Sequence, residues 1–258
     1  MKERDKGMPE RQLSPGLQTL PDQIAERIYA AIVGGQYQPG ERIREEELAV
    51  TFGVSRGPIR EALRILERDS VVRVVPNRGA HVTTLSVQEL NDIFEIRRVL
   101  SGLLGRRLSK PPPEFLERVG ESVKELERRA RGTDQEAYIA ASLDLTLLLA
   151  DASGNALLAG IMRSITRQSW RYTQLALKNM DRRKESARNW RALFVALSSG
   201  KEAPAAAAME KLVEDARRGA IRMLEDGQAE DAAAAAAKAA AKAPASSAPG
   251  RKPRRIAG

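Results

Sequence analysis

Apolar residues recur at helical spacing along most of this chain, and one short segment, residues 71–84, interrupts that pattern. There a valine-rich run leads into the turn sequence Pro-Asn-Arg-Gly at 76–79 and then into a second extended run, as in a β-hairpin. Three helical segments precede the hairpin and only helical ones follow it. The expected fold is therefore mainly α: an N-terminal winged helix-turn-helix (three helices plus a β-hairpin wing), followed by an all-α antiparallel helical bundle.

Glycines and helix-capping residues set the limits of the first three helices. Helical spacing starts at Leu20 and stops at Gly34-Gly35. The second helix is expected over residues 44–52, and Gly53 ends it. Ser55 is a good N-cap for a third helix that runs to about Asp69.

Breaks rich in Pro, Gly and Ser divide the rest of the chain into six helical segments. We expect these helices at 86–109, 114–131, 134–152, 155–179, 182–199 and 204–225. The predicted organisation is a disordered lead (1–19), the winged domain (20–84), the helical domain (86–228) and a flexible Ala/Lys/Arg-rich tail (229–258).

Composition excludes several classes of protein. The chain has no cysteine, which excludes disulfides, thiolate nucleophiles and zinc ribbons. Its single histidine, His81, excludes a two-histidine metal site, so we do not expect an enzyme. His81 falls in the predicted wing and is expected to be an exposed side chain. No stretch approaches the roughly 20 apolar residues of a membrane span, and the charged N-terminus is unlike a secretion signal, so a cytoplasmic protein is expected.

The net charge of +9 does not locate a nucleic-acid-binding domain. Residues 1–85 carry only +1, whereas residues 231–258 carry +5. Any claim of DNA binding must therefore rest on where particular arginines point.

The third predicted helix places an arginine row beside an apolar face. At helical spacing, Arg56, Arg60 and Arg64 share one arc, and the adjacent arc carries Ile59, Ala62, Leu63 and Leu66. Such a helix suits a major groove, because a guanidinium group can make paired hydrogen bonds to guanine or to phosphate. Ser55 would present the helix N-terminus to a phosphate, and Pro58 is tolerated in the first turn.

The alternative is an ordinary surface helix with a solvated arginine face, which is the commoner meaning of such a charge row. The context favours DNA binding. A Gly-Val-Ser-Arg turn precedes the helix, and a hairpin with Asn77, Arg78 and Gly79 at its tip follows it.

The segment ERIREEELAVTFGVSRGPIREALRILERDSVVRVVPNRGAHVTTLS resembles the DNA-binding domain of GntR-type regulators, over roughly residues 20–84. Together with the helix geometry, the resemblance implies a DNA interface that contains Arg44, Ser55, Arg56, Gly57, Pro58, Arg60, Asn77, Arg78 and Gly79. The family usually has a glycine before the first wing strand, where this chain has Asp69-Ser70. A positive φ there would cost Ser70 slightly more than glycine.

Residues 86–226 resemble the all-helical C-terminal domain of the FadR-type branch, on the strength of IFEIRRVL, ADASGNALL and AAAAMEKLV. Many members hold a divalent metal with one aspartate and three histidines. By alignment from Asn155, those positions fall at Ser142, Thr146, Trp190 and Leu212. None is a suitable ligand and Asp144 cannot hold a metal alone, so the resemblance predicts a metal-free domain.

The same resemblance suggests an effector cavity, with Arg97, Thr146, Asn155 and Trp190 as candidate effector-binding residues. Arg97 could hold a carboxylate, or it could form only an interhelical salt bridge. Asn155 could reach the cavity or cap a helix. Trp190 could line a pocket for an organic or aromatic acid, or simply fill the core together with Thr146 and Leu212.

Two functions compete at this stage. The favoured one is a sequence-specific transcription regulator: a homodimer on a near-palindromic double-stranded DNA operator, and a repressor released by a small-molecule effector. The other is a sequence-nonspecific nucleic-acid binder driven by the basic tail, whose binding would depend on salt and not on sequence.

Overall fold

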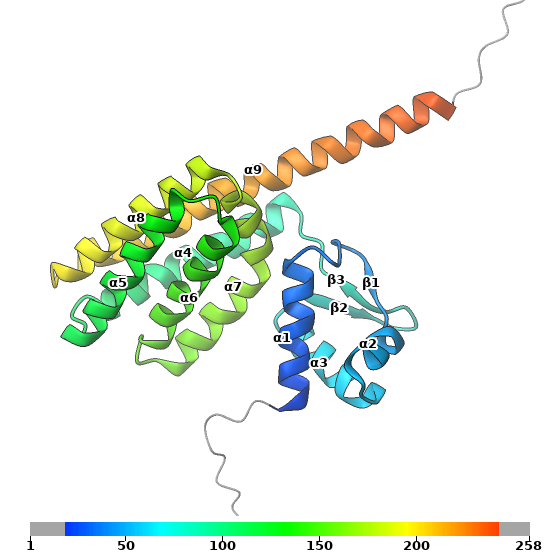
Figure 1. The fold of residues 1–258 in the computed structure, drawn as a ribbon, viewed down its shortest axis with the longest axis horizontal. Coiled ribbons are helices and arrows are strands. Elements are labelled where there is room, and N and C mark those ends of the chain that lie inside the picture. Colours follow the sequence, from blue (N-terminus) through cyan, green and yellow to red (C-terminus); the bar gives the residue numbers. More distant parts are fainter. Residues whose placement is uncertain (1–18, 243–258) are drawn as a thin grey trace, which may run out of the picture.

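The computed structural model describes residues 19–242, with side chains as far as residue 229. A small lobe comprises α1 to β3, and a larger, all-helical lobe comprises α4 to α9 (Figure 1). The small lobe contains α1 (Leu20–Val33), β1 (Arg42–Ile43), α2 (Glu45–Phe52), α3 (Arg56–Arg68), β2 (Val72–Val75) and β3 (Gly79–Val82). The predicted fold class is thereby confirmed.

The strands form an antiparallel sheet in the order β1-β3-β2. Strands β2 and β3 are the predicted hairpin, and β1 is an addition that the sequence did not indicate. It begins at Arg42, which pairs with His81. Helix α2 therefore begins one residue later than predicted, and Arg44 is its N-cap residue.

Two residues other than glycine adopt the left-handed conformation in this lobe. Ser70 has φ of 54°, and Asn77 at the wing tip has φ of 61°. The expected positive φ before the first wing strand is confirmed. Because a side chain makes this conformation unfavourable, Ser70 carries strain that glycine would avoid.

The small lobe has its own apolar core, to which α1, α3 and the sheet contribute. Ile59, Ala62 and Leu66 of α3 are fully buried there against Ile24 and Ile28 of α1. The arc of α3 that the spacing assigned to the core is thus the one that packs, which leaves the arginine arc on the surface.

The large lobe contains the six predicted helices in the predicted order. They are α4 (Val87–Arg107), α5 (Pro113–Ala130), α6 (Gln135–Asp151), α7 (Ala156–Leu177), α8 (Met180–Ser198) and α9 (Glu202–Lys242). Consecutive helices from α5 to α9 pack as neighbours, and α9 returns along α4. Ser86 caps α4 and Asn155 caps α7. Each side chain accepts a hydrogen bond from a backbone amide in the first turn of its helix.

Helix α9 runs to Lys242, so the expectation of a flexible tail from residue 229 is wrong for residues 229–242. In Figure 1 the helix projects past the bundle. The physical reason is the alanine content of residues 232–240, because alanine has the highest intrinsic helix propensity. The predicted disordered lead, except for Thr19, and the rest of the predicted tail lie outside the described residues.

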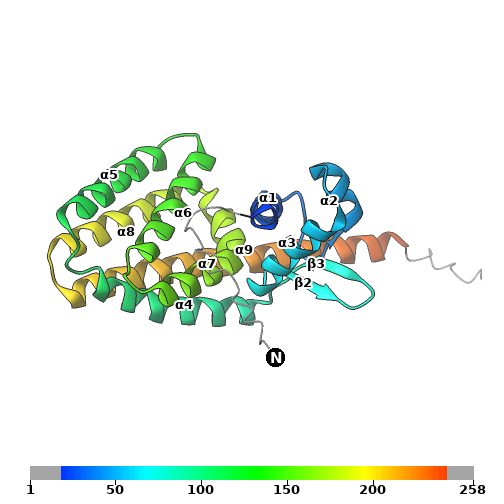
Figure 2. The same cartoon turned by 90° about the horizontal axis from the view of Figure 1, so that it is seen from below.

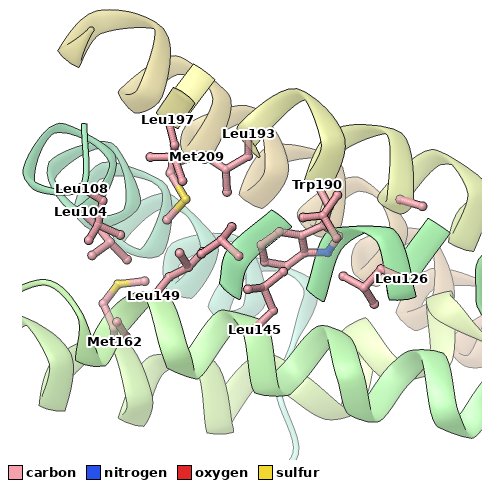
Figure 3. Close-up of a cluster of buried hydrophobic side chains, with 14 of the residues drawn as sticks. Leu104, Leu108, Leu126, Leu145, Leu149, Met162, Trp190, Leu193, Leu197 and Met209 are labelled. Atoms are coloured by element: carbon pink, nitrogen blue, oxygen red, sulfur yellow. The ribbon is translucent and has the colours of Figure 1, made fainter. Parts of the chain in front are cut away.

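The core of the large lobe surrounds Trp190, a residue that is 2% exposed (Figure 3). Leu126, Leu145 and Leu193 belong to the same buried cluster. Close contact between α4 and α9 requires Gly105, because a Cβ atom there would lie 2.5 Å from the carbonyl oxygen of Ala205. In residues 19–242, no helix is both long enough and apolar enough to cross a membrane.

Candidate nucleic-acid interface and helical-domain cavity

The turn between α2 and α3 presents the N-terminus of α3 to solvent. Gly53 adopts the left-handed conformation that ends α2. Ser55 is the N-cap of α3 as predicted, but its side chain makes no capping hydrogen bond and is exposed. Its hydroxyl group and the first amides of α3 therefore remain available to an anion, as at other helix N-termini. Gly57 and Pro58 lie in that first turn.

Arg56, Arg60 and Arg64 of α3 are exposed, and glutamates hold them in ion pairs. Arg56 Nη2 lies 2.7 Å from Glu46 Oε1, and Arg60 Nε lies 2.8 Å from Glu45 Oε2. Arg64 pairs with Glu61, one turn before it on α3. All three arginine side chains are more than half exposed. Pairs this exposed contribute little to stability, so a phosphate group can replace the glutamates.

Sequence reasoning did not assign a role to the glutamates of α2. Glu45, Glu46 and Glu47 form the first turn of α2, where the positive end of the helix dipole favours acidic residues. Their run in the sequence was a visible signal, but their contact with α3 depends on the crossing of the two helices. Arg44 pairs with Glu47.

The wing, which is the hairpin of β2 and β3, lies beside the start of α3. A groove of about 330 Å³ is lined by Arg44 and Arg56 together with Gly79 of the wing. The Arg42 side chain lies over Gly79, whose missing Cβ would sit 3.4 Å from Arg42 Nε. Helix α2 and the hairpin lie on the side of the small lobe away from the bundle (Figures 1 and 2). The structure thus brings three predicted site residues, Arg44, Arg56 and Gly79, to one groove.

Asn77 and Arg78 occupy the wing tip, where the amide of Arg78 donates to the carbonyl oxygen of Val75. His81 is half-buried, whereas we expected it to be exposed. Its Nδ1 lies 3.2 Å from the carbonyl oxygen of Gly40, and its Nε2 lies 3.3 Å from that of Arg78. His81 therefore braces the wing.

Helix α7 holds the small lobe through two arginines that sequence reasoning missed. Arg171 Nη1 donates to the carbonyl oxygens of Ile32 (2.6 Å) and Tyr37 (3.0 Å). Arg167 pairs with Glu26 and Asp69. We call Arg167 and Arg171 the interlobe clasp. No single segment of sequence signals it, because its partners lie roughly 100 to 140 residues away along the chain.

The four positions that the alignment assigned to metal ligands meet in space. Ser142, Thr146, Trp190 and Leu212 line one cavity of about 30 Å³ in the bundle, together with Arg97. Asn155 does not line this cavity. Its Oδ1 accepts a hydrogen bond from the backbone amide of Leu158 at the start of α7. Of the two predicted roles for Asn155, the structure shows the helix cap.

The guanidinium group of Arg97 is buried in this cavity with few partners. The residue is 3% exposed, and its Nη1 donates to Ser169 Oγ at 3.2 Å. Its Nε has no hydrogen-bond partner, and the group lies 5.6 Å from the centroid of the Phe94 ring. Burial lowers the pKa of Arg97 to about 10. In the part of the chain that the structure describes, Arg97 has no carboxylate partner, so it does not form the interhelical salt bridge that was the alternative.

The residues at the aligned metal positions do not fit a divalent cation. They offer two hydroxyl groups, an indole and a leucine side chain, and Thr146 donates its hydroxyl hydrogen to the carbonyl oxygen of Ser142. The side chains that usually hold divalent metals in proteins are carboxylates, imidazoles and thiolates, and none of these four residues supplies one. Asp144 is exposed. No group of three His, Cys, Asp or Glu residues with metal-binding geometry occurs among the described residues.

Each lobe matches the model of a known protein family. The model of "Bacterial regulatory proteins, gntR family" matches residues 20–82, and the FCD domain model matches residues 92–215. The HTH-type transcriptional regulator YdhC of Bacillus subtilis is 32% identical over 145 residues, which are 55% of this chain and 65% of that one. The HTH-type transcriptional repressor GlaR of Escherichia coli is 38% identical over 73 residues, 28% of this chain and 33% of that one.

The gluconate operon transcriptional repressor of Bacillus subtilis is 33% identical over 87 residues, 34% of this chain and 35% of that one. The chain thus spans less than two thirds of the length of these relatives. Solved structures share the fold: McbR/YncC of E. coli has a TM-score of 0.68 and 20% identity over 77% of this chain and 95% of that one. A GntR transcriptional regulator of Rhodococcus sp. RHA1 has a TM-score of 0.64 and 22% identity, over 80% of this chain and 97% of that one.

The two domain matches lie in the order that the structure shows, and each falls within one lobe. The chain belongs to the gntR family of bacterial regulatory proteins, in the branch that carries an FCD domain.

Proposed function

We propose that the protein is a cytoplasmic transcription regulator, and not an enzyme, that binds a double-stranded DNA operator through α3 and the wing. The observation that carries this proposal is the single exposed face on which Arg56 and Arg60 lie beside Arg44 and the wing tip. In this arrangement α3 enters the major groove, and Asn77, Arg78 and Gly79 contact the backbone or the minor groove.

Binding exchanges partners at the α2–α3 surface. Phosphate oxygens and base edges replace the carboxylates of Glu45 and Glu46 at Arg56 and Arg60. The first turn of α3, with Ser55, receives a phosphate, because its amides and the helix dipole favour an anion there. Once released, Glu45 and Glu46 repel misplaced phosphates, so they favour the correct register.

A second copy of the chain completes the operator complex. Helix α4 exposes Ile96, Val99 and Leu103, which recur at helical spacing and form an apolar stripe outside the bundle. Contact between two such stripes forms a homodimer that presents two α3 helices to successive major grooves.

The helical domain supplies regulation. Helix α7 contributes Trp170 and Thr173 to the cavity and Arg167 and Arg171 to the clasp. A small-molecule effector in the cavity displaces α7 and thereby shifts the position of the small lobe. The gluconate operon relatives are transcriptional repressors. We propose that the unliganded form of this protein also represses and that the effector releases it.

Selection from random duplexes at about physiological salt tests the proposal, because sequence-independent binding is weak there. The wild type is compared with Arg60→Ala and with Arg118→Ala, a matched control whose arginine is exposed on α5, away from the stripe on α4. A short inverted repeat should emerge with the wild type and the control and fade with Arg60→Ala.

The opposite outcome is equally clear. If no sequence is enriched, yet binding persists and disappears when residues 231–258 are removed, the protein is a nonspecific binder driven by the basic tail. The +5 charge of that segment is the observation in favour of this second candidate.

A further inference from the structure

The imidazole ring of His81 lies between two hydrogen-bond acceptors. Its Nδ1 is 3.2 Å from the carbonyl oxygen of Gly40, and its Nε2 is 3.3 Å from the carbonyl oxygen of Arg78. Gly40 precedes β1, and Arg78 lies at the tip of the hairpin of β2 and β3. The ring therefore joins the wing tip to the segment that leads into β1.

Both contacts of His81 need a hydrogen atom on the ring. A carbonyl oxygen only accepts hydrogen bonds, so each ring nitrogen must donate. Neutral imidazole carries one N–H group, whereas imidazolium carries two. In the neutral form one ring nitrogen faces a carbonyl oxygen, lone pair against lone pair. The two contacts are therefore both hydrogen bonds only when His81 is protonated.

The charged groups around His81 act on that proton. Alternating burial along β3 places His81 on the face of the sheet away from the core, and its cross-strand partners are Arg42 on β1 and Arg73 on β2. Directly opposite residues project on the same face, so both guanidinium groups oppose a further positive charge at His81. Two carboxylates border the sheet, those of Glu41 and Glu67, and each accepts a hydrogen bond from a backbone amide.

DNA phosphates change this balance. In the proposed complex, Arg78 and Gly79 contact the DNA backbone or the minor groove. Phosphate groups there offset the positive charges of Arg42 and Arg73 and so favour the protonated form of His81. The protonated ring then holds the carbonyl oxygen of the planar peptide between Arg78 and Gly79, which keeps the wing tip in one orientation.

We propose that His81 is a positioning residue of the wing and that DNA binding takes up a proton on its imidazole ring, which donates to Gly40 and Arg78 together only in that charged state. This inference rests on the proposed function, because it takes the wing as part of the DNA interface. A complex that binds a proton more tightly than the free protein does is strongest at low pH, and its affinity falls as the pH rises through the histidine range. DNA affinity thus responds to pH independently of any effector in the helical domain.

Operator affinity at about pH 5.5 and about pH 7, at constant salt, tests the proposal. His81 is the only histidine and the chain has no cysteine, so no other side chain ordinarily titrates in this window. The wild type should bind about tenfold more tightly at the lower pH, which is the effect of roughly one hydrogen bond from a charged group. His81→Gln, whose side chain stays neutral, should bind equally at both.

Ser198→His in the His81→Gln background is the matched control. Ser198 is exposed at the end of α8 in the large lobe, so the added histidine titrates in the same range without bracing the wing. This double variant should stay insensitive to pH. Nuclear magnetic resonance of isotope-labelled histidine provides a second readout. In the wild type bound to DNA at the lower pH, both ring nitrogens should carry a hydrogen-bonded proton.

The proposal is wrong if the wild type binds equally at the two pH values, if His81→Gln keeps the pH dependence, or if Ser198→His restores it. If His81→Gln fails to fold, the resonance measurement decides, since a ring with a single N–H group in the complex contradicts the proposal. If no operator is selected, the regulator proposal fails by itself. A scrambled duplex at low salt is then the probe for His81, because backbone contacts do not depend on sequence.

Discussion

Replacing Arg171 by methionine should loosen the small lobe from the bundle. The Arg171 guanidinium group donates to two backbone carbonyl oxygens, of Ile32 and Tyr37, and to the side-chain oxygen of Gln38 at 3.0 Å. Ile32 lies in the last turn of α1, which has no basic residue of its own. Arg171 therefore also supplies the cation that stabilises the negative end of that helix.

The expected cost follows from these contacts. A hydrogen bond from a charged group contributes about 1.5–3 kcal/mol when buried, but Arg171 is partly exposed and water replaces some of each bond. We therefore expect Arg171→Met to lower the free energy of unfolding by about 2–3 kcal/mol and the Tm by about 5–10 °C. Methionine keeps most of the apolar stem, so packing is largely preserved.

Arg163→Met is the matched control on the same helix. Arg163 pairs with Asp151 at 2.7 Å, but both side chains are about half exposed, so its loss should cost no more than about 0.5 kcal/mol. Urea unfolding gives the two free energies, and hydrogen exchange should show faster exchange at the C-terminal turn of α1 in Arg171→Met alone. Equal free energies for the two variants would refute the role of the clasp.

Three further changes test the fold. Gly105→Ala should lower the free energy of unfolding by about 3 kcal/mol in urea titrations, because the new Cβ meets the backbone of Ala205; an unchanged midpoint would contradict the close approach of α4 and α9. Ser70→Gly should raise the Tm slightly, by relief of about 1 kcal/mol of left-handed strain less the added entropy of the unfolded chain; a fall in Tm would count against that strain. Thr19→Ala should cost about 1 kcal/mol near neutral pH, because Thr19 and Asp22 form a capping box. Hydrogen bonds from Thr19 lower the pKa of Asp22. The stability that the Asp22 carboxylate adds is therefore present above its unfolded pKa of about 3.9 and is lost as the pH falls through its folded pKa. If the loss of stability in Thr19→Ala is the same at every pH down to about 2, the carboxylate contributes nothing.

The sequence predicted those features of the fold that depend on residues close together along the chain. The arginine and apolar arcs of α3 follow from the helical repeat. The positive φ of Ser70 was expected from the resemblance, because the family usually has a glycine there. Strand β1 has two residues, too few to show any periodicity. The end of α9 was placed too early because its alanine run lacks an apolar face, although alanine needs none to remain helical.

The candidate sites were only partly predictable for the same reason. The resemblance predicted that Ser142, Thr146 and Trp190 occupy equivalent positions, and they line one cavity. Whether Arg97 has an acidic partner depends on side chains from several helices, which no single segment of sequence reveals. The pairing of Arg56 and Arg60 with the glutamates of α2, like the interlobe clasp, is likewise a result of tertiary packing.

The most direct test of the account is the ratio of operator affinity to scrambled-duplex affinity, measured for the wild type and Arg60→Ala at about physiological salt. If Arg60 reads a base, its loss should weaken operator binding about 10- to 100-fold, corresponding to roughly 1–3 kcal/mol, and should leave binding to the scrambled duplex nearly unchanged. An equal loss on both duplexes would contradict the account, since Arg60 would then contribute only its charge.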